Sequence, residues 1–271
     1  MNVFIKKIKK MLNRKKSLTI GMIQDDVHWH NAKKNIKKFE KIIFSNNKKV
    51  DIWILPELFT TGFTMKPEEV YESMNGLSIK WMKTISKKKN AAIMGSIVIY
   101  EKKKYFNRLI FSHPNGKIEY YDKHHLFTLI GENKVYKCGN KKLLINFYGW
   151  KIRPLICYDL RFPVWSRNID NYDILIIVAQ WPKNRILAWD SLLKARAIEN
   201  MSYCIGLNRT GKDKHNLKYN GHSAAYDYLG NKLSYMSNKK AIKIIKLNKE
   251  KLDLCRKELP FLNDKDNFVI N

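Results

Sequence analysis

A glutamate, a lysine and a cysteine each follow an apolar run of this 271-residue sequence. Glu57 follows the run 50–55 after a proline, Lys123 comes just after the run 118–121, and Cys157 ends a third run. Open α/β sheets place their chemistry at the carboxyl ends of strands. A thiol at such an end can be aimed and desolvated, and a carboxylate in apolar surroundings can both take and give protons. The three residues are therefore candidates for nucleophilic and acid–base catalysis.

Each candidate also has an ordinary structural interpretation. Free cysteines are commonly small core residues, a glutamate after a strand is commonly a solvated loop acid, and most lysines lie on the surface. Lys123 differs from the other lysines in its neighbours, since tyrosines precede it and Phe127 follows it. The adjacent His124 and His125 belong to no HxxxH pattern, and neighbours on a strand point to opposite faces. No metal site is predicted.

The elements that must position these residues alternate between strand and helix patterns. Apolar residues at helical spacing predict helices over 31–44, 78–89 and 185–200. Short apolar runs predict strands over 18–24, 50–55, 91–100, 107–112, 118–121, 173–179, 203–208, 223–227 and 241–247, besides the run that ends at Cys157. No linker and no short repeat interrupts the series. The pattern predicts a single α/β domain over residues 17–271.

The three candidates stand in sequence motifs that resemble the Glu–Lys–Cys triad of the nitrilase, or carbon–nitrogen hydrolase, superfamily. The motifs keep their order and their neighbours: Pro-Glu at 56–57, Asp-Lys-His-His-Leu-Phe at 122–127 and Leu-Ile-Cys-Tyr-Asp-Leu-Arg-Phe-Pro at 155–163. Further stretches are similar to the bacterial omega-amidase branch, namely Phe-Thr-Thr-Gly-Phe at 59–63, the continuation Val-Trp-Ser-Arg-Asn at 164–168 and Ala-Arg-Ala-Ile-Glu-Asn at 195–200.

This resemblance implies a four-layer α-β-β-α sandwich and an amidase that needs no cofactor and no metal. It implies that Cys157 attacks an amide carbonyl, that Lys123 and the backbone N–H of Tyr158 hold the oxyanion, and that Glu57 moves the protons. Glu132 matches a second glutamate of the family, although the residues around it diverge. A free thiol has a pKa of about 8.5, and a neighbouring cation is expected to lower that of Cys157.

The substrates that the resemblance implies are 2-oxoglutaramate and 2-oxosuccinamate, which the branch converts to 2-oxo dicarboxylates and ammonia. A carboxylate on the substrate would suit a guanidinium, and Arg161 lies near the nucleophile in sequence. Phe63 and Trp181 are candidates for the pocket wall, and all three residues have a structural alternative as fold-bracing or core residues. A different linear amide or an N-carbamoyl compound is the alternative substrate within the superfamily.

The composition is strongly basic, with 52 Lys and Arg against 24 Asp and Glu and a formal charge of +28. A nucleic-acid-binding protein is therefore the alternative from another functional class. A nucleic-acid binder concentrates its cations on one face with aromatics between them, whereas these lysines are spread along the whole chain. We interpret the charge as compositional bias and predict no specific nucleic-acid partner.

Residues 1–16 are basic without any acidic residue, and we interpret them as an extension that is either disordered or read from a mis-assigned start. No apolar run reaches the roughly 18–20 residues of a membrane span, so no membrane partner is predicted. The four cysteines are widely spaced, which favours a reducing, cytoplasmic location. The family resemblance implies a homodimer.

Overall fold

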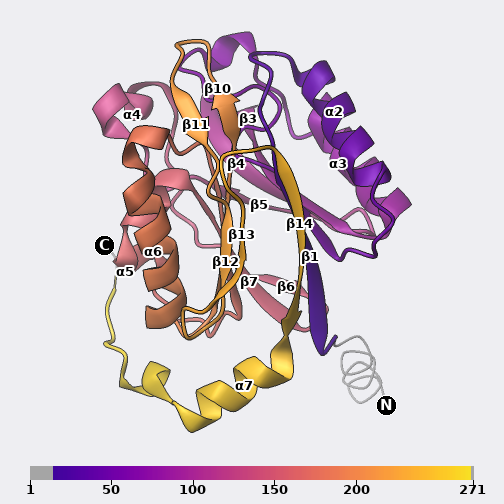
Figure 1. Cartoon of the computed structure of the whole chain (residues 1–271). Helices are drawn as coiled ribbons and strands as arrows, with labels where there is room; N and C mark the ends of the chain where they lie inside the picture. Colours follow the sequence, from indigo (N-terminus) through magenta and orange to yellow (C-terminus); the bar gives the residue numbers. More distant parts are fainter. Residues whose placement is uncertain (1–14, 270–271) are drawn as a thin grey trace, which may run out of the picture.

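The computed structural model describes residues 15–269, and its centre is a pair of six-stranded β-sheets (Figure 1). The strand order is β14-β1-β2-β3-β4-β5 in the first sheet and β13-β12-β9-β8-β7-β6 in the second. The predicted basic extension over 1–16 lies outside the described residues except for Lys15 and Lys16. Lys15 donates its backbone N–H to Tyr148, and β1 begins at Ser17.

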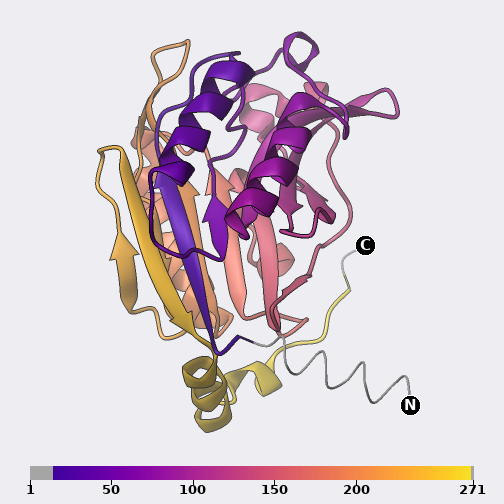
Figure 2. The ribbon, with the colours of Figure 1, turned by 90° about the vertical axis from the view of Figure 1, so that its right-hand side faces the viewer.

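In the first sheet, β1 pairs in parallel with β2 and β2 in parallel with β3, whereas the outer pairs are antiparallel. Helices α2 (Ala32–Phe44) and α3 (Leu77–Lys89) cover its outer face (Figure 2). Asn31 caps α2 by accepting a hydrogen bond from the backbone N–H of Lys34. The strands are β1 (Ser17–Gln24), β2 (Ile52–Ile54), β3 (Ala92–Glu101), β4 (Lys104–Ser112), β5 (Ile118–Asp122) and β14 (Ala241–Asn248).

In the second sheet, β7, β8 and β9 run parallel to one another and form its centre. Helix α6 (Ile186–Glu199) packs on this sheet from the side away from the first sheet (Figure 1). The strands are β6 (Ile145–Phe147), β7 (Trp150–Ile156), β8 (Ile174–Ala179), β9 (Tyr203–Asn208), β12 (Ala224–Tyr226) and β13 (Lys232–Tyr235). The short helices α4 (Glu132–Val135) and α5 (Pro163–Ser166) lie in the connections.

The largest hydrophobic cluster joins side chains from both sheets, for example Ile54 of β2 with Ile156 of β7. Trp53, between Ile52 and Ile54, belongs to a second cluster beneath α2 and α3. This alternation follows from strand geometry, in which successive side chains point to opposite faces. Both faces of each central strand are therefore buried. The predicted four-layer α-β-β-α sandwich is confirmed.

The elements that the sequence did not predict are short or lie at the edges. They include the edge strands β6 and β13 and the two-stranded hairpin β10 (Thr210–Lys212) and β11 (Lys218–Asn220). The tail from residue 249, for which the sequence predicted no helix, contains α7 (Lys249–Glu258). Only Leu252 of α7 is buried, so the helix carries little apolar signal. Among the described residues, no helix is long and apolar enough to cross a membrane.

Candidate active site

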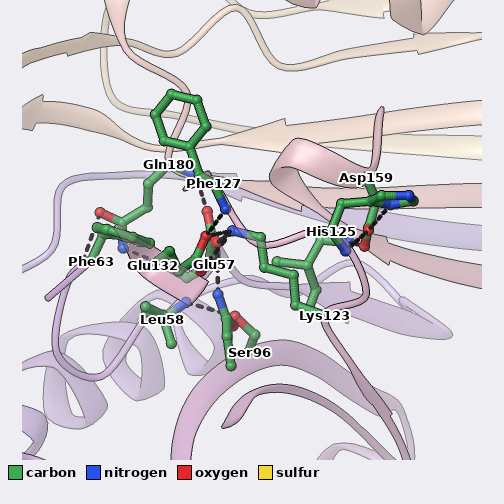
Figure 3. Close-up of polar contacts among 12 residues, drawn as sticks. Glu57, Leu58, Phe63, Ser96, Lys123, His125, Phe127, Glu132, Asp159 and Gln180 are labelled. Carbon is green, nitrogen blue, oxygen red and sulfur yellow. Dashed lines mark hydrogen bonds and ion pairs between the residues drawn. The ribbon is translucent and has the colours of Figure 1, made fainter. Parts of the chain in front are cut away.

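Glu57, Lys123 and Cys157 meet in one cavity of about 500 Å³, although they come from different parts of the chain. Glu57 lies beyond β2, Lys123 follows β5, and Cys157 follows β7. Lys123 Nζ lies 3.2 Å from Glu57 Oε1 and 3.0 Å from each carboxylate oxygen of Glu132, so it extends between two glutamates (Figure 3). Lys123 and both glutamates are almost completely buried. The arrangement is a buried ammonium between two carboxylates beside a thiol.

Hydrogen bonds fix both carboxylate oxygens of Glu57. The Asn107 side-chain amide donates to Oε1 at 2.8 Å, and the backbone N–H of Gln180 donates to Oε2 at 2.7 Å. The Gln180 side chain also donates to the backbone carbonyl of Glu57 at 2.8 Å. The sequence prediction missed Asn107 and Gln180, although Gln180 directly follows the strand that ends at Ala179. The location of Gln180 at the carboxyl end of a predicted strand is the signal that could have identified it as a site residue.

Cys157 begins the 3₁₀ turn Cys157–Arg161 with φ of +46°, a left-handed conformation that costs a non-glycine residue about 1–2 kcal/mol. The buried Asp159 holds this turn in place. Its carboxylate accepts from the Ile156 backbone N–H at 3.1 Å, the Tyr121 hydroxyl at 2.8 Å and the His125 backbone N–H at 2.9 Å. Tyr121 and His125 flank Lys123, so one carboxylate ties the lysine segment to the cysteine turn (Figure 3).

Burial and neighbouring charges determine the protonation states of Lys123 and Cys157. Burial disfavours the Lys123 ammonium, but Glu132 and Glu57 outweigh burial and raise the pKa of Lys123. Burial, followed by the negative charge of Glu57, raises the pKa of the Cys157 thiol well above its usual value, and Lys123 offsets only part of this rise. Lys123 lowers this pKa, as expected of a neighbouring cation, but burial and Glu57 outweigh it and the net shift is upward. The resting site holds a charged lysine and a protonated thiol next to a base.

Replacement of Glu57 by glutamine is expected to lower the pKa of Cys157. The variant loses the negative charge that raises this pKa and keeps Lys123, which lowers it. A lower pKa means a larger thiolate fraction at any given pH. The measurement is the ultraviolet absorbance of the thiolate against pH, with the same variant carrying Cys157→Ala subtracted. A thiolate that appears at the same or a higher pH than in the wild type would contradict this electrostatic account.

The structure places the other predicted site residues around the same cavity. Phe63, Tyr158, Arg161 and Trp181 all line it, and Phe63 lies with its ring 5.6 Å from Lys123 Nζ. Trp181 is buried, and the guanidinium of Arg161 lies 5.0 Å from its ring. Cavity residues that the sequence prediction missed include Trp29, Met65, Phe127, Arg185 and the hairpin residues Asp213 and Tyr219.

The two histidines after Lys123 have aromatic partners. His124 stacks on Trp165 with ring centroids 3.6 Å apart, and His125 stacks on Phe162 at 3.7 Å. The His125 ring also contacts Asp159 at 2.9 Å. Over residues 15–269, no group of three or more histidine, cysteine or acidic side chains is arranged to hold a metal ion.

The chain is similar to known proteins over most of its length. Residues 19–257 match the family model of the carbon–nitrogen hydrolases. The omega-amidase YafV of Escherichia coli K12 is 36% identical over 93% of this chain and 98% of its own length. The 2-oxoglutaramate amidase of Bacillus subtilis is 32% identical over 91% of this chain and 96% of its own. A Xanthomonas campestris CN-hydrolase superfamily protein, crystallised with an arsenic adduct in its active site, superimposes with a TM-score of 0.92 at 34% identity, covering 95% of this chain and all of its own.

The fold is a two-sheet sandwich, and the relatives match this chain over nearly their full length. The chain therefore belongs to the carbon–nitrogen hydrolase family of the nitrilase superfamily. It is a hydrolase that acts on amide C–N bonds. Within the family, its similarity to YafV and to the B. subtilis enzyme supports the omega-amidase branch.

Proposed function

We propose that this enzyme hydrolyses a small 2-oxo acid amide, 2-oxoglutaramate or 2-oxosuccinamate, to the 2-oxo dicarboxylate and ammonia. The observation that carries the proposal is the meeting of Glu57, Lys123 and Cys157 in one cavity. The substrate class rests on relatives that are named as an omega-amidase and a 2-oxoglutaramate amidase.

In the first half of the reaction, Cys157 Sγ attacks the amide carbonyl as Glu57 takes the thiol proton. A base is needed because the pKa of Cys157 is raised, so the thiol is protonated at neutral pH. The oxyanion that forms is stabilised by the Lys123 ammonium and the backbone N–H of Tyr158. Glu57 then gives the proton to the amide nitrogen, the C–N bond breaks, ammonia leaves, and a thioester remains on Cys157.

In the second half, a water molecule hydrolyses the thioester. Glu57 takes a proton from the water, the hydroxide adds to the carbonyl, and the C–S bond breaks as the proton returns to sulfur. Glu132 positions Lys123 and compensates its charge through two contacts of 3.0 Å. Phe63 and Trp181 form walls of the substrate cavity, and Arg161 supplies a cation for the substrate carboxylate.

Ammonia release from 2-oxoglutaramate by the purified protein tests the proposal, measured beside a panel of N-carbamoyl compounds and neutral amides. We expect 2-oxoglutaramate to be the fastest substrate. Turnover of a carbamoyl compound alone would retain the hydrolase and replace the substrate. A folded protein that hydrolyses no amide, yet retains RNA in a salt-dependent manner that Cys157→Ala does not change, would instead favour a nucleic-acid-binding function.

The proposal extends to a homodimer located in the cytoplasm. Exposed apolar side chains on α5, α6 and the turn before β13 support an association surface: Val164, Leu187, Ile198 and Leu229. Sedimentation equilibrium tests the dimer, and a monomer mass at micromolar concentration would reject it. The wide spacing of the four cysteines suits a reducing compartment.

A further inference from the structure

Two half-buried arginines on the wall of the cavity lack an acidic partner, whereas the buried Lys123 has two. Lys123 forms ion pairs with Glu57 and Glu132, and the exposed Lys66 of the cavity lining pairs with Glu69. Lys214 of the lining lies over the Trp29 ring instead. Arg161 and Arg185 also lie against aromatic rings, and no ion pair joins either guanidinium to a carboxylate within residues 15–269. A guanidinium that lines a largely apolar cavity without an anion is poised to bind one.

Trp181 positions both arginines. Its ring lies 5.0 Å from the guanidinium of Arg161, and its indole N–H donates to the backbone carbonyl of Arg185 at 2.8 Å. Trp181 is itself fixed, because its backbone N–H donates to the Asn208 side chain at 2.7 Å and its carbonyl accepts from the same side chain at 2.9 Å. One buried residue thus holds the side chain of the first arginine and the backbone of the second.

Phe127 supports the guanidinium of Arg185. The guanidinium lies 5.0 Å from the Phe127 ring, which also packs edge-on against Tyr158, the residue after the nucleophile, at 4.9 Å. The Phe127 ring points away from the Glu57–Lys123–Glu132 cluster, while its backbone N–H donates to Glu132 (Figure 3). A guanidinium packed on an aromatic face keeps its N–H groups available at the edge. Arg185 therefore contacts the cavity beside the cysteine turn without joining the cluster.

The carboxylate of Asp213 also lines the cavity, but its hydrogen bonds are made within the β10–β11 hairpin. Asp213 accepts hydrogen bonds from the backbone N–H groups of His215 at 2.8 Å and Leu217 at 3.0 Å, and from the Tyr219 hydroxyl at 3.1 Å. The charge available to a substrate at Arg161 and Arg185 is therefore positive.

We propose that Arg161 and Arg185 together form the subsite that binds the carboxylate end of the substrate, and that Arg185 is a specificity-determining residue. The inference rests on the proposed function and adds a substrate rule: the enzyme prefers small amides that carry a carboxylate and hydrolyses neutral amides of the same length with a higher KM. Two planar guanidinium groups can bind the carboxylate and the adjacent oxo oxygen at the same time. The low dielectric of the cavity strengthens these contacts.

The test compares Arg185→Gln with Lys183→Gln, a control that removes an exposed charge from the same 3₁₀ turn without touching the cavity. The substrates are 2-oxoglutaramate and a neutral amide with a methyl group in place of the carboxylate. For Arg185→Gln we expect KM for 2-oxoglutaramate to rise roughly 10- to 100-fold, as for a lost charge-assisted hydrogen bond, with kcat little changed. The neutral amide should be unaffected, and Arg185→Lys should recover part of the loss.

Arg161→Gln and the double variant test whether both arginines bind the same group. If they do, the KM effects of the single variants are not additive in the double variant. Equal effects of Arg185→Gln on the charged and the neutral amide, or no effect on either, would overturn the inference.

A binding measurement separates this inference from the proposed chemistry. Calorimetric titration of Cys157→Ala with 2-oxoglutaramate requires no turnover, and binding that weakens in Cys157→Ala/Arg185→Gln supports the subsite even if wild-type enzyme releases no ammonia. Equal affinity in the two variants rejects the subsite, even if wild-type enzyme hydrolyses the amide.

Discussion

Replacing Cys157 with alanine is expected to reduce ammonia release by about 10⁴-fold or more, since loss of the nucleophile removes the covalent route. Folding should be retained, because alanine keeps the Cβ atom and the Asp159 contacts that hold the turn do not involve the thiol. The measurements are the rate of ammonia release and the midpoint of thermal unfolding.

Cys138→Ala is the matched control, since Cys138 is an exposed free thiol that does not line the cavity. This variant should keep wild-type activity. Substantial hydrolysis by folded Cys157→Ala would show that the thioester route is wrong and that water attacks the amide directly.

Replacing Lys123 with methionine is expected to abolish activity and also to destabilise the fold. The variant leaves the buried carboxylates of Glu57 and Glu132 without the ammonium that lies 3.2 Å and 3.0 Å from them. Breaking a buried ion pair by removing one partner costs about 3–5 kcal/mol. The free energy of unfolding, measured by denaturant titration, should fall by about this amount, and ammonia release should fall to background because the oxyanion loses its cation.

Further variants separate the loss of activity from the loss of stability. Lys134→Met, on the exposed surface of α4, removes the same charge and should change neither quantity. Addition of Glu57→Gln and Glu132→Gln to Lys123→Met neutralises the stranded carboxylates, so stability should recover in part while activity remains absent. An unchanged stability in Lys123→Met would mean that the ion cluster contributes nothing to folding.

The prediction of the second glutamate depended on the family motif rather than on local chemistry. Glu132 begins the four-residue helix α4 after a positive-φ glycine, with no strand before it. Burial, followed by Glu57, raises the pKa of Glu132, and Lys123 opposes the rise. These interactions require residues that only the folded chain brings together.

The sequence by itself determined the architecture of the central strands and where the reactive residues stand along the chain. Apolar runs of five to ten residues and helical spacing are local properties, so they predicted the parallel strands and the helices that cover them. The motifs around Glu57, Lys123 and Cys157 were sufficient for the family. Strand β6 was missed because it has only three residues, and β13 and α7 were missed because an exposed edge strand and an exposed helix carry little hydrophobic pattern.

Only the tertiary structure decided how these residues act on one another. Strand β2 belongs to the first sheet and β7 to the second. The packing of the two sheets brings Glu57 next to Cys157, although the two residues lie far apart in the sequence. The pKa of the thiol depends on burial and on the charges of Glu57 and Lys123, and burial together with Glu57 outweighs the lowering by Lys123. Arg185 joined the cavity because Trp181 and Phe127 hold it there. Spacing along a sequence specifies strand ends, whereas electrostatic interactions depend on distances in space that only packing sets.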